Sequence, residues 1–269
     1  MRSLLTKTIK HSWFVFFTFL GLTFSGCGGD GDLPEIKVAE PSLSLSFQLS
    51  HEGQDVALNE SFIDEEGNNV KLVAFKFYMA DIKLKAVDSE ELISSMELFD
   101  AKPFDASIST PQWRDVYEFD VPEGVFNRLE FGIGVPADLN GVDPSTYSNN
   151  DPLSTYSNMY WSWASMYRFI ILEAKIDTTG GENFDHDVIF HTGLDDLYRS
   201  GVERDIDLSF SIGEEQSLSL TVDWDNLFYH YDYINLKGES STHTTDSQTE
   251  FELAERFTDN FVKAIRVKP

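Results

Sequence analysis

The sequence is almost without cysteine: Cys27 is the single one among 269 residues. One cysteine cannot form a disulfide within a single chain, so a packed apolar core must stabilise the protein, even in an oxidising compartment. A chain of this length is long enough to bury one large core or two small ones.

Motifs of several enzyme classes are absent as well. The sequence contains no G-x-S-x-G, H-E-x-x-H, C-x-x-C or P-loop motif, so the corresponding hydrolytic, zinc, dithiol and nucleotide chemistries have no support. Paired carboxylates occur by chance among 46 acidic residues and give no specific signal for a glycosidase. We therefore predict that the protein is not an enzyme.

Basic residues are scarce. The chain has 20 Lys and Arg against 46 Asp and Glu, for a formal net charge of −26 at pH 7. Such a surface repels nucleic acid and anionic lipid headgroups and attracts cations or a basic protein. We expect no nucleic-acid partner, and membrane contact only through a lipid anchor.

The N-terminus carries a short apolar run over residues 13–22, with basic residues before it and small residues leading to Cys27 after it. The run is too short for a comfortable membrane span. The pattern is typical of a bacterial lipoprotein signal, with cleavage before Cys27 and a lipid on its sulfur. We predict a signal peptide over residues 1–26 and a protein anchored in the cell envelope, at the periplasmic face of the outer membrane or the cell surface. The alternative is a short anchor that is never cleaved.

Residues 27–40 are rich in glycine and acidic residues and predict a flexible acidic tether. From residue 41 the hydropathy pattern changes: apolar and polar residues alternate with the period of a half-buried strand. The same alternation recurs over residues 204–212 and 218–224. Residues 41–269 therefore predict a single β domain of about eight or nine strands.

One convincing helix is predicted, at the C-terminus. Ser247-Gln248-Thr249-Glu250 is a capping-box sequence. It precedes an apolar stripe made by Phe251, Ala254, Phe257, Phe261 and Ile265. The predicted fold is mainly β, an antiparallel β-sandwich with a C-terminal amphipathic helix.

The segment 159–169, MYWSWASMYRF, is the most aromatic part of the chain. In a strand, Trp161 and Trp163 point to the same face. The pair is either part of an aromatic core or an exposed surface that binds a ligand.

Histidine is the remaining source of site chemistry. Imidazole is the commonest neutral metal ligand, and strand ends can bring distant histidines together. Downstream of the predicted signal the chain has five: His51, His186, His191, His230 and His243.

Five ordered motifs resemble successive signatures of the MbnP family, from about Ser42 to the terminal helix. They are FQLSHEG at 47–53, FKFYMADIKL at 75–84, FGIGVP at 131–136, MYWSW at 159–163 with YRF at 167–169, and FHTG at 190–193. Members of this family are periplasmic or surface copper-binding proteins associated with methanobactin and related to a copper-repressible surface protein of methanotrophs.

The resemblance implies a β-rich fold and a Cu(I) site that uses histidine. In some members it also implies a tryptophan oxidised to kynurenine by a partner, a di-haem cytochrome c peroxidase-like protein. Trp161 and Trp163 match the family's aromatic segment, and His191 matches the histidine of its F-H-x-G run. His51 matches a histidine after the first strand, and His243 one before the last helix. The chain departs from the family at residues 164–166, where a glycine before the tyrosine is usual, and it lacks the cysteine pairs of some members.

The sequence thus predicts a lipid-anchored copper-binding accessory protein, with Cu(I) held by His51, His191 and His243 near the Trp-Ser-Trp segment. A thioether from Met159 or Met166 would suit this soft ion. The alternative is a glycan- or small-ligand-binding β-sandwich lipoprotein that uses the Trp pair as a stacking platform. A third interpretation is a purely structural envelope lipoprotein with buried tryptophans.

Overall fold

The computed structural model describes residues 39–102, 107, 109, 114–162, 165–244 and 247–268. The predicted signal peptide, the lipidation site Cys27 and most of the predicted tether lie outside the described residues. Within the described part of the chain, no helix is long and apolar enough to cross a membrane.

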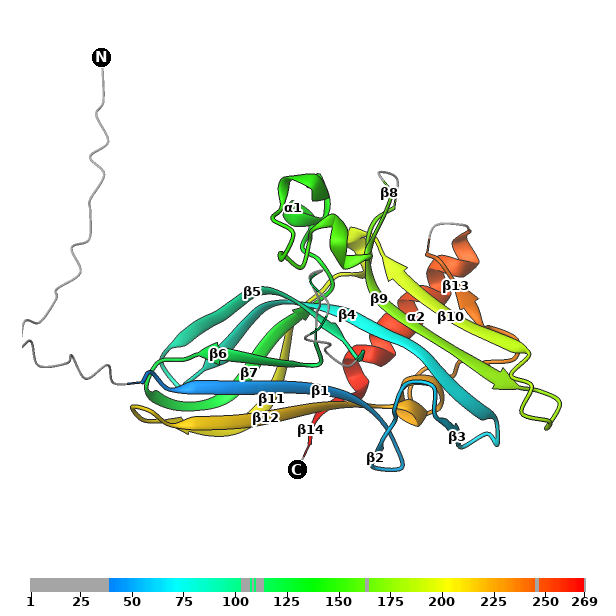
Figure 1. Ribbon diagram of the computed structural model, residues 1–269, viewed down its shortest axis with the longest axis horizontal. Coiled ribbons are helices and arrows are strands. Elements are labelled where there is room, and N and C mark those ends of the chain that lie inside the picture. The colour runs from blue at the N-terminus through cyan, green and yellow to red at the C-terminus, as the bar shows by residue number, and fades with distance from the viewer. Residues whose placement is uncertain are drawn as a thin grey trace, which may run out of the picture. The chain divides into compact units, whose positions relative to one another are not determined.

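Strand β1 (Ser42–His51) follows the predicted alternation, with its leucines and Phe47 buried. It pairs in parallel along its length with β12 (Glu215–Asp223), and β14 (Ile265–Val267) joins the far side of β12. Two short strands, β2 (Gln54–Asp55) and β6 (Val116–Asp120), share the other edge of β1. These five strands form the first sheet (Figure 1).

The second sheet is larger and contains the strands that carry the candidate site. Its main order is β11 (Arg199–Phe210), β7 (Gly124–Ile133), β4 (Asn69–Lys85), β9 (Met166–Asp177), β10 (His186–Gly193) and β13 (Ser241–Thr242). Three further strands pair with β4 or β9: β3 (Ser61–Ile63), β5 (Glu90–Asp100) and β8 (Tyr160–Ser162).

The mainly β fold, the sandwich and the C-terminal helix are confirmed. The described residues form 14 strands rather than eight or nine, because several strands of only two or three residues have no period to detect. The sheets are mixed rather than antiparallel, since β1–β12 and β10–β13 pair in parallel. Alternation shows which face of a strand is buried and says nothing about the direction of its neighbour.

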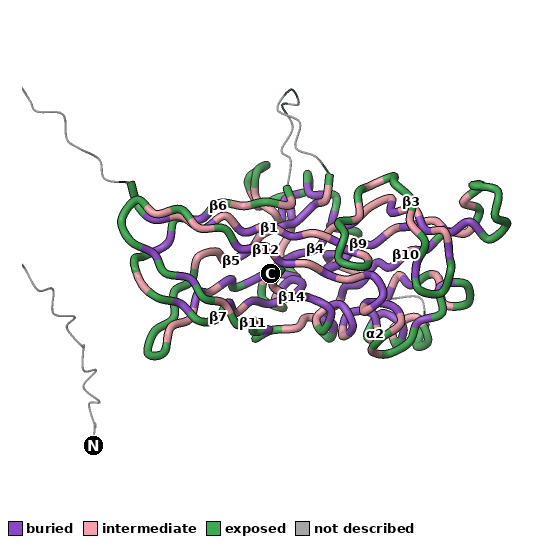
Figure 2. The backbone as a smooth tube through the Cα atoms, turned by 90° about the horizontal axis from the view of Figure 1, so that it is seen from below, coloured by how far each residue is buried: buried purple, intermediate pink, exposed green. Residues whose placement is uncertain are grey.

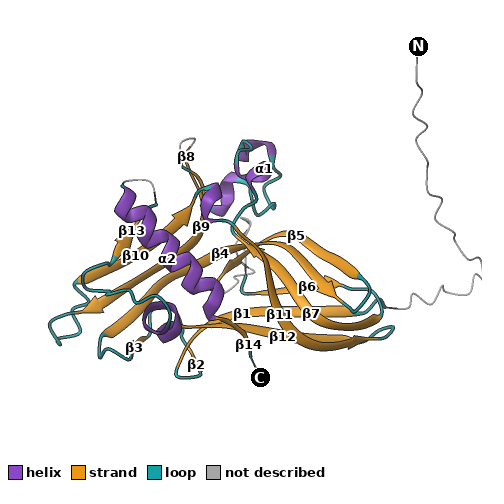
Figure 3. Ribbon diagram, turned by 180° about the vertical axis from the view of Figure 1, so that it is seen from behind, coloured by secondary structure: helices purple, strands orange, loops and turns teal. Residues whose placement is uncertain are grey.

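The predicted helix is α2 (Gln248–Ala264), and the Ser247 side chain accepts the backbone N–H of Glu250 at 3.2 Å. Ile265, the last residue of the predicted stripe, instead begins β14. Figure 3 shows α2 crossing the back of the second sheet. The other helical segments are short turns in loops: α1 (Ala137–Asn140), Pro144–Thr146, Thr155–Ser157, Asp195–Leu197 and Asn226–His230.

A cluster of phenylalanines joins both sheets to α2. The ring of Phe77 on β4 lies 4.4 Å from Phe47 on β1 and 5.2 Å from Phe261 on α2, centroid to centroid, and stacks on Phe99 of β5 at 5.3 Å. All four side chains are buried. In Figure 2 buried positions recur along the strands, whereas exposed positions gather at strand ends and loops.

Replacing Phe77 by alanine removes the ring shared by all three layers. We expect the Phe77→Ala variant to lose about 3–5 kcal/mol of unfolding free energy, measured by urea denaturation. Val87→Ala is the control, because Val87 is 85% exposed and its truncation should change stability by less than about 0.5 kcal/mol. Equal losses in the two variants would contradict the assignment of Phe77 to the centre of the core.

Candidate metal centre

The aromatic segment folds as a hairpin between β8 and β9, with Tyr160 opposite Tyr167. The Tyr160 ring packs edge-on against the buried Tyr167 ring, with centroids 5.1 Å apart. Trp161 follows on the opposite face of β8, as strand geometry requires, and is 43% exposed. Trp163 lies outside the described residues, so the structure places only Trp161 of the predicted pair.

His191 lies near the end of β10, just before an irregularity in the pairing with β9 at Thr192/Gly193. The backbones approach so closely here that a Cβ atom on residue 193 would lie 2.6 Å from the carbonyl oxygen of Tyr167. Only glycine fits this position without a shift of backbone. The F-H-T-G run therefore has a physical explanation: its glycine permits the close approach that brings His191 near the β8–β9 hairpin.

His243 is held by its neighbours in the chain. Thr242 pairs with β10, and its hydroxyl donates to the carbonyl oxygen of Glu250 at 2.7 Å. The backbone N–H of His243 donates to the Glu250 carboxylate at 3.0 Å, and the Thr244 hydroxyl donates to the carbonyl oxygen of His191 at 2.9 Å. The first turn of α2 and the end of β10 thus fix the backbone on both sides of His243.

Three rings from these three segments meet edge-on or tilted around one point. The ring centroids of His191 and His243 lie 5.2 Å apart, and Trp161 lies 6.1 Å from His191 and 5.4 Å from His243. They line a hollow of about 10 Å³. This is the volume needed for about one water molecule, so the hollow suits a single ion and excludes a sugar ring.

Two further residues shape the hollow. Arg168 donates to the backbone carbonyls of Asn158 and Met159 and places its guanidinium 5.8 Å from the centre of the Trp161 ring. Thr192 also lines the hollow, and its buried hydroxyl oxygen has no hydrogen-bond partner within the described part of the chain.

His191 is 8% exposed, and its Nε2 lies 2.8 Å from Oε1 of Glu173. Burial lowers the pKa of the His191 imidazole below its usual 6.5. The hydrogen bond to Glu173 opposes this shift, and the positive charge of Arg168 adds to it. The ring is therefore neutral near pH 7, which is the form that binds metals.

The two imidazoles are too few donors for a usual zinc site. No group of three His, Cys, Asp or Glu side chains suited to a metal occurs among residues that the structure describes. Zinc usually requires a full tetrahedral set of such ligands. Imidazole also suits copper, and Cu(I), a d¹⁰ ion, accepts low coordination numbers.

The structure brings together Trp161, His191 and His243 and places His51 elsewhere. His51 ends β1 beside β2, at the opposite edge of the sandwich from β8 in Figures 1 and 3. Its Nδ1 lies 2.9 Å from the buried Asp225, and its ring packs on Phe62. Strand ends can meet at either edge of a sheet, and the sequence does not tell which.

The predicted thioethers are also absent from the lining of the hollow. Met159 is fully buried in the core, and Met166 has a left-handed backbone (φ +54°) in the tight β8–β9 hairpin. Sequence reasoning missed Glu173 and Arg168 as members of the site. Glu173 had one usable signal, since it interrupts the apolar run of β9.

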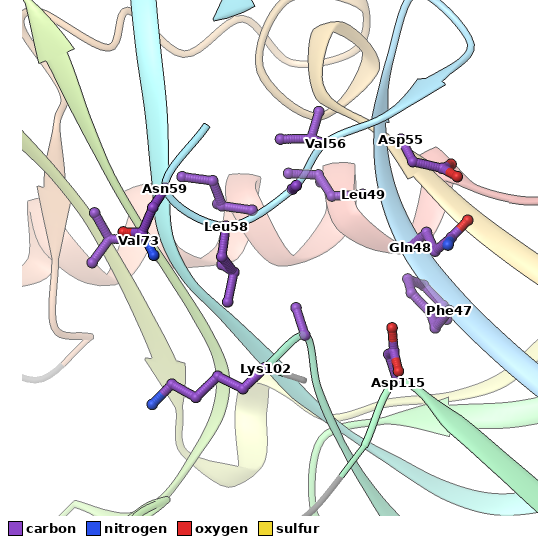
Figure 4. Close-up of a pocket in the computed structure, with 13 residues that line it drawn as sticks. Phe47, Gln48, Leu49, Asp55, Val56, Leu58, Asn59, Val73, Lys102 and Asp115 are labelled. Carbon is purple, nitrogen blue, oxygen red and sulfur yellow. The ribbon is translucent and has the colours of Figure 1, made fainter. Parts of the chain in front are cut away.

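A larger hollow, of about 490 Å³, lies between β1 and β4. Figure 4 shows Lys102 and Asp115 on one side of it and Leu49 and Val56 on the other. No histidine or tryptophan is among its described lining residues. A small ligand bound there would not stack on Trp161.

The lowered pKa of His191 predicts how the metal-free protein responds to pH. The folded-state pKa lies below the unfolded value of about 6.5, so His191 contributes stability above that pH. This contribution is lost as pH falls through the folded-state pKa. In an NMR titration, the His191 ring proton should titrate with a midpoint below 6.5, and His191→Gln provides the assignment. A midpoint above 6.5 would contradict the buried, neutral imidazole.

The sequence model of the MbnP family matches residues 40–248 of this chain. Among solved structures, the fold is similar to MbnP from Methylosinus trichosporium, with a TM-score of 0.52 and 14% sequence identity. The similarity covers 79% of this chain and 86% of that chain. No curated protein matches the chain in sequence. The structural likeness concerns the fold alone, whereas the family match spans well over half of the sequence. The chain belongs to the MbnP family.

Proposed function

We propose that this protein is a lipid-anchored copper-binding accessory protein of the bacterial envelope, and that it holds Cu(I) between His191 and His243 beside Trp161. The observation that carries the proposal is the meeting of these three rings around an ion-sized hollow. Copper is the cargo of such a site, so the protein stores or delivers the ion and catalyses no reaction.

The electrostatics around the hollow support Cu(I). His191 is neutral near pH 7, so binding displaces no proton from its ring. The guanidinium of Arg168 adds a positive charge beside the site, which disfavours a divalent ion more than a monovalent one. At long range, the net charge of −26 concentrates cations near the surface.

The exposure of Trp161 supports the proposal of a redox partner. Its indole is 43% exposed, so an oxidising protein can approach it without unfolding the hairpin. The acidic surface suits docking of a basic electron-transfer protein, and a di-haem cytochrome c peroxidase-like enzyme fits this role. Conversion of Trp161 to kynurenine would need an oxidant delivered by that partner: the C2–C3 bond of the indole breaks, C3 becomes a ketone, C2 leaves as formate after hydrolysis, and an arylamine remains. The chemistry of the wall of the hollow would change accordingly.

Copper competition tests the ligand assignment. A chromophoric Cu(I) chelator competes with the purified protein under anaerobic, reducing conditions. We expect His191→Ala and His243→Ala each to weaken Cu(I) binding by more than about 100-fold, since even outer-shell changes cost 10–100-fold. His51→Ala is the matched control and should bind as the wild type does.

Two results would refute the copper proposal. One is wild-type protein that holds no more Cu(I) than the double variant His191→Ala/His243→Ala. The other is quenching of the Trp161 fluorescence by oligosaccharides and not by Cu(I), which is the behaviour of a glycan-stacking surface.

Mass spectrometry of protein isolated from its native host tests the redox partner. We expect the peptide that contains Trp161 to differ from its encoded mass by the net exchange of one carbon for one oxygen. A Trp161→Phe variant should lack the change. Its persistence in that variant would assign the oxidation to another tryptophan, and an unmodified wild type would remove the case for an oxidising partner.

A further inference from the structure

Glu173 and His191 are diagonal neighbours on the paired strands β9 and β10. Glu173 lies opposite Ile189, and His191 lies opposite Ile171, so the two side chains share one face of the sheet. The carboxylate reaches the ring at 2.8 Å and remains 37% exposed, whereas the imidazole is almost entirely buried. The Glu173 carboxylate thus contacts His191, the proposed copper ligand, from the solvent side.

We propose that Glu173 is a positioning residue, which holds His191 in the tautomer that carries its proton on Nε2 and so leaves the lone pair of Nδ1 to bind the ion. The role in ion binding rests on the proposed function. The tautomer itself does not, because it is a property of the metal-free protein.

The argument follows from the donor and acceptor inventory of the two groups. A neutral imidazole carries one proton, and an ionised carboxylate can only accept hydrogen bonds. The ring nitrogen that faces Glu173 must therefore be the N–H, which makes Nδ1 the acceptor. Histidine ligands in metal sites commonly donate their second nitrogen to a carboxylate, which fixes the ring and raises its basicity.

The sequence context strengthens the assignment. Residues 169–176 are otherwise apolar except for Lys175, which pairs with Asp187. Glu173 has no lysine or arginine within salt-bridge distance in the described residues, and the His191 ring is its hydrogen-bond partner. A carboxylate that served only solubility would not need to contact a buried ring.

NMR spectroscopy tests the tautomer without any metal. A long-range ¹H–¹⁵N correlation spectrum of the metal-free protein, recorded well above the His191 pKa, reports which ring nitrogen carries the proton. We expect His191 in the Nε2–H form in the wild type. In Glu173→Gln the side-chain amide can donate as well as accept, so the spectrum should shift toward the Nδ1–H form. A wild type in the Nδ1–H form, or an unchanged Glu173→Gln spectrum, overturns the proposal.

Copper competition then tests the consequence. We expect Glu173→Gln to weaken Cu(I) binding about 10–100-fold. Glu203→Gln is the matched control: Glu203 is also a strand residue with a side chain 37% exposed, but it pairs with Lys85. It should leave both the tautomer and the affinity unchanged.

The two experiments separate the two proposals. Wild type that binds no Cu(I) refutes the proposed function. The tautomer spectra still decide whether Glu173 fixes the tautomer of the His191 ring. Wild type that binds Cu(I) while Glu173→Gln shifts the tautomer and keeps full affinity overturns the positioning role. Thermal unfolding of both variants excludes a general loss of structure as the cause of weaker binding.

Discussion

The contact of Phe77 with Phe47 and Phe261 is the interaction on which the rest of this structure depends. It joins β4, β1 and α2, and no disulfide is available to do so. The position of α2 in turn fixes Glu250, whose carbonyl and carboxylate oxygens hold the backbone at residues 242 and 243. The placement of His243 beside His191 is therefore a consequence of core packing several turns of helix away.

The second constraint is the close approach of β9 and β10 at Gly193. A side chain there would meet the carbonyl oxygen of Tyr167, so the absence of a Cβ atom is what allows the strands to converge beside the aromatic hairpin. Gly134 shows the same principle nearby: its φ of +102° suits glycine, and a Cβ atom would lie 2.5 Å from the Phe169 ring. Both glycines lie in family motifs, and both let backbones or aromatic rings pack more closely than other residues permit.

The candidate site combines two histidines on well-anchored backbone with one exposed aromatic side chain. His191 and its neighbour Thr192 are buried, and the backbone around His243 is tied to both α2 and β10. Trp161 is the exposed member, and Arg168 connects its ring to the hairpin backbone. This combination is what the proposed function requires: preorganised imidazoles for the proposed ion, and an exposed indole for the proposed oxidising partner.

Much of this arrangement could be predicted from the sequence. Alternation along β1, β11 and β12 identified the β fold, because a half-buried strand must bury every second residue. Ser247 and the apolar stripe after it identified α2. The F-H-T-G and W-S-W motifs pointed to His191 and Trp161, and the order of the motifs along the chain indicated the family before any fold was known.

The tertiary structure decided which of these residues meet. It grouped Trp161 with His191 and His243 and separated them from His51, although the resemblance to the family had suggested all three histidines as ligands. It also supplied Glu173 and Arg168, whose roles depend on strand register and direction. The physical reason is that local periodicity specifies the buried face of a strand, whereas its partner, its register and the edge at which it ends are set by packing between residues far apart in the chain.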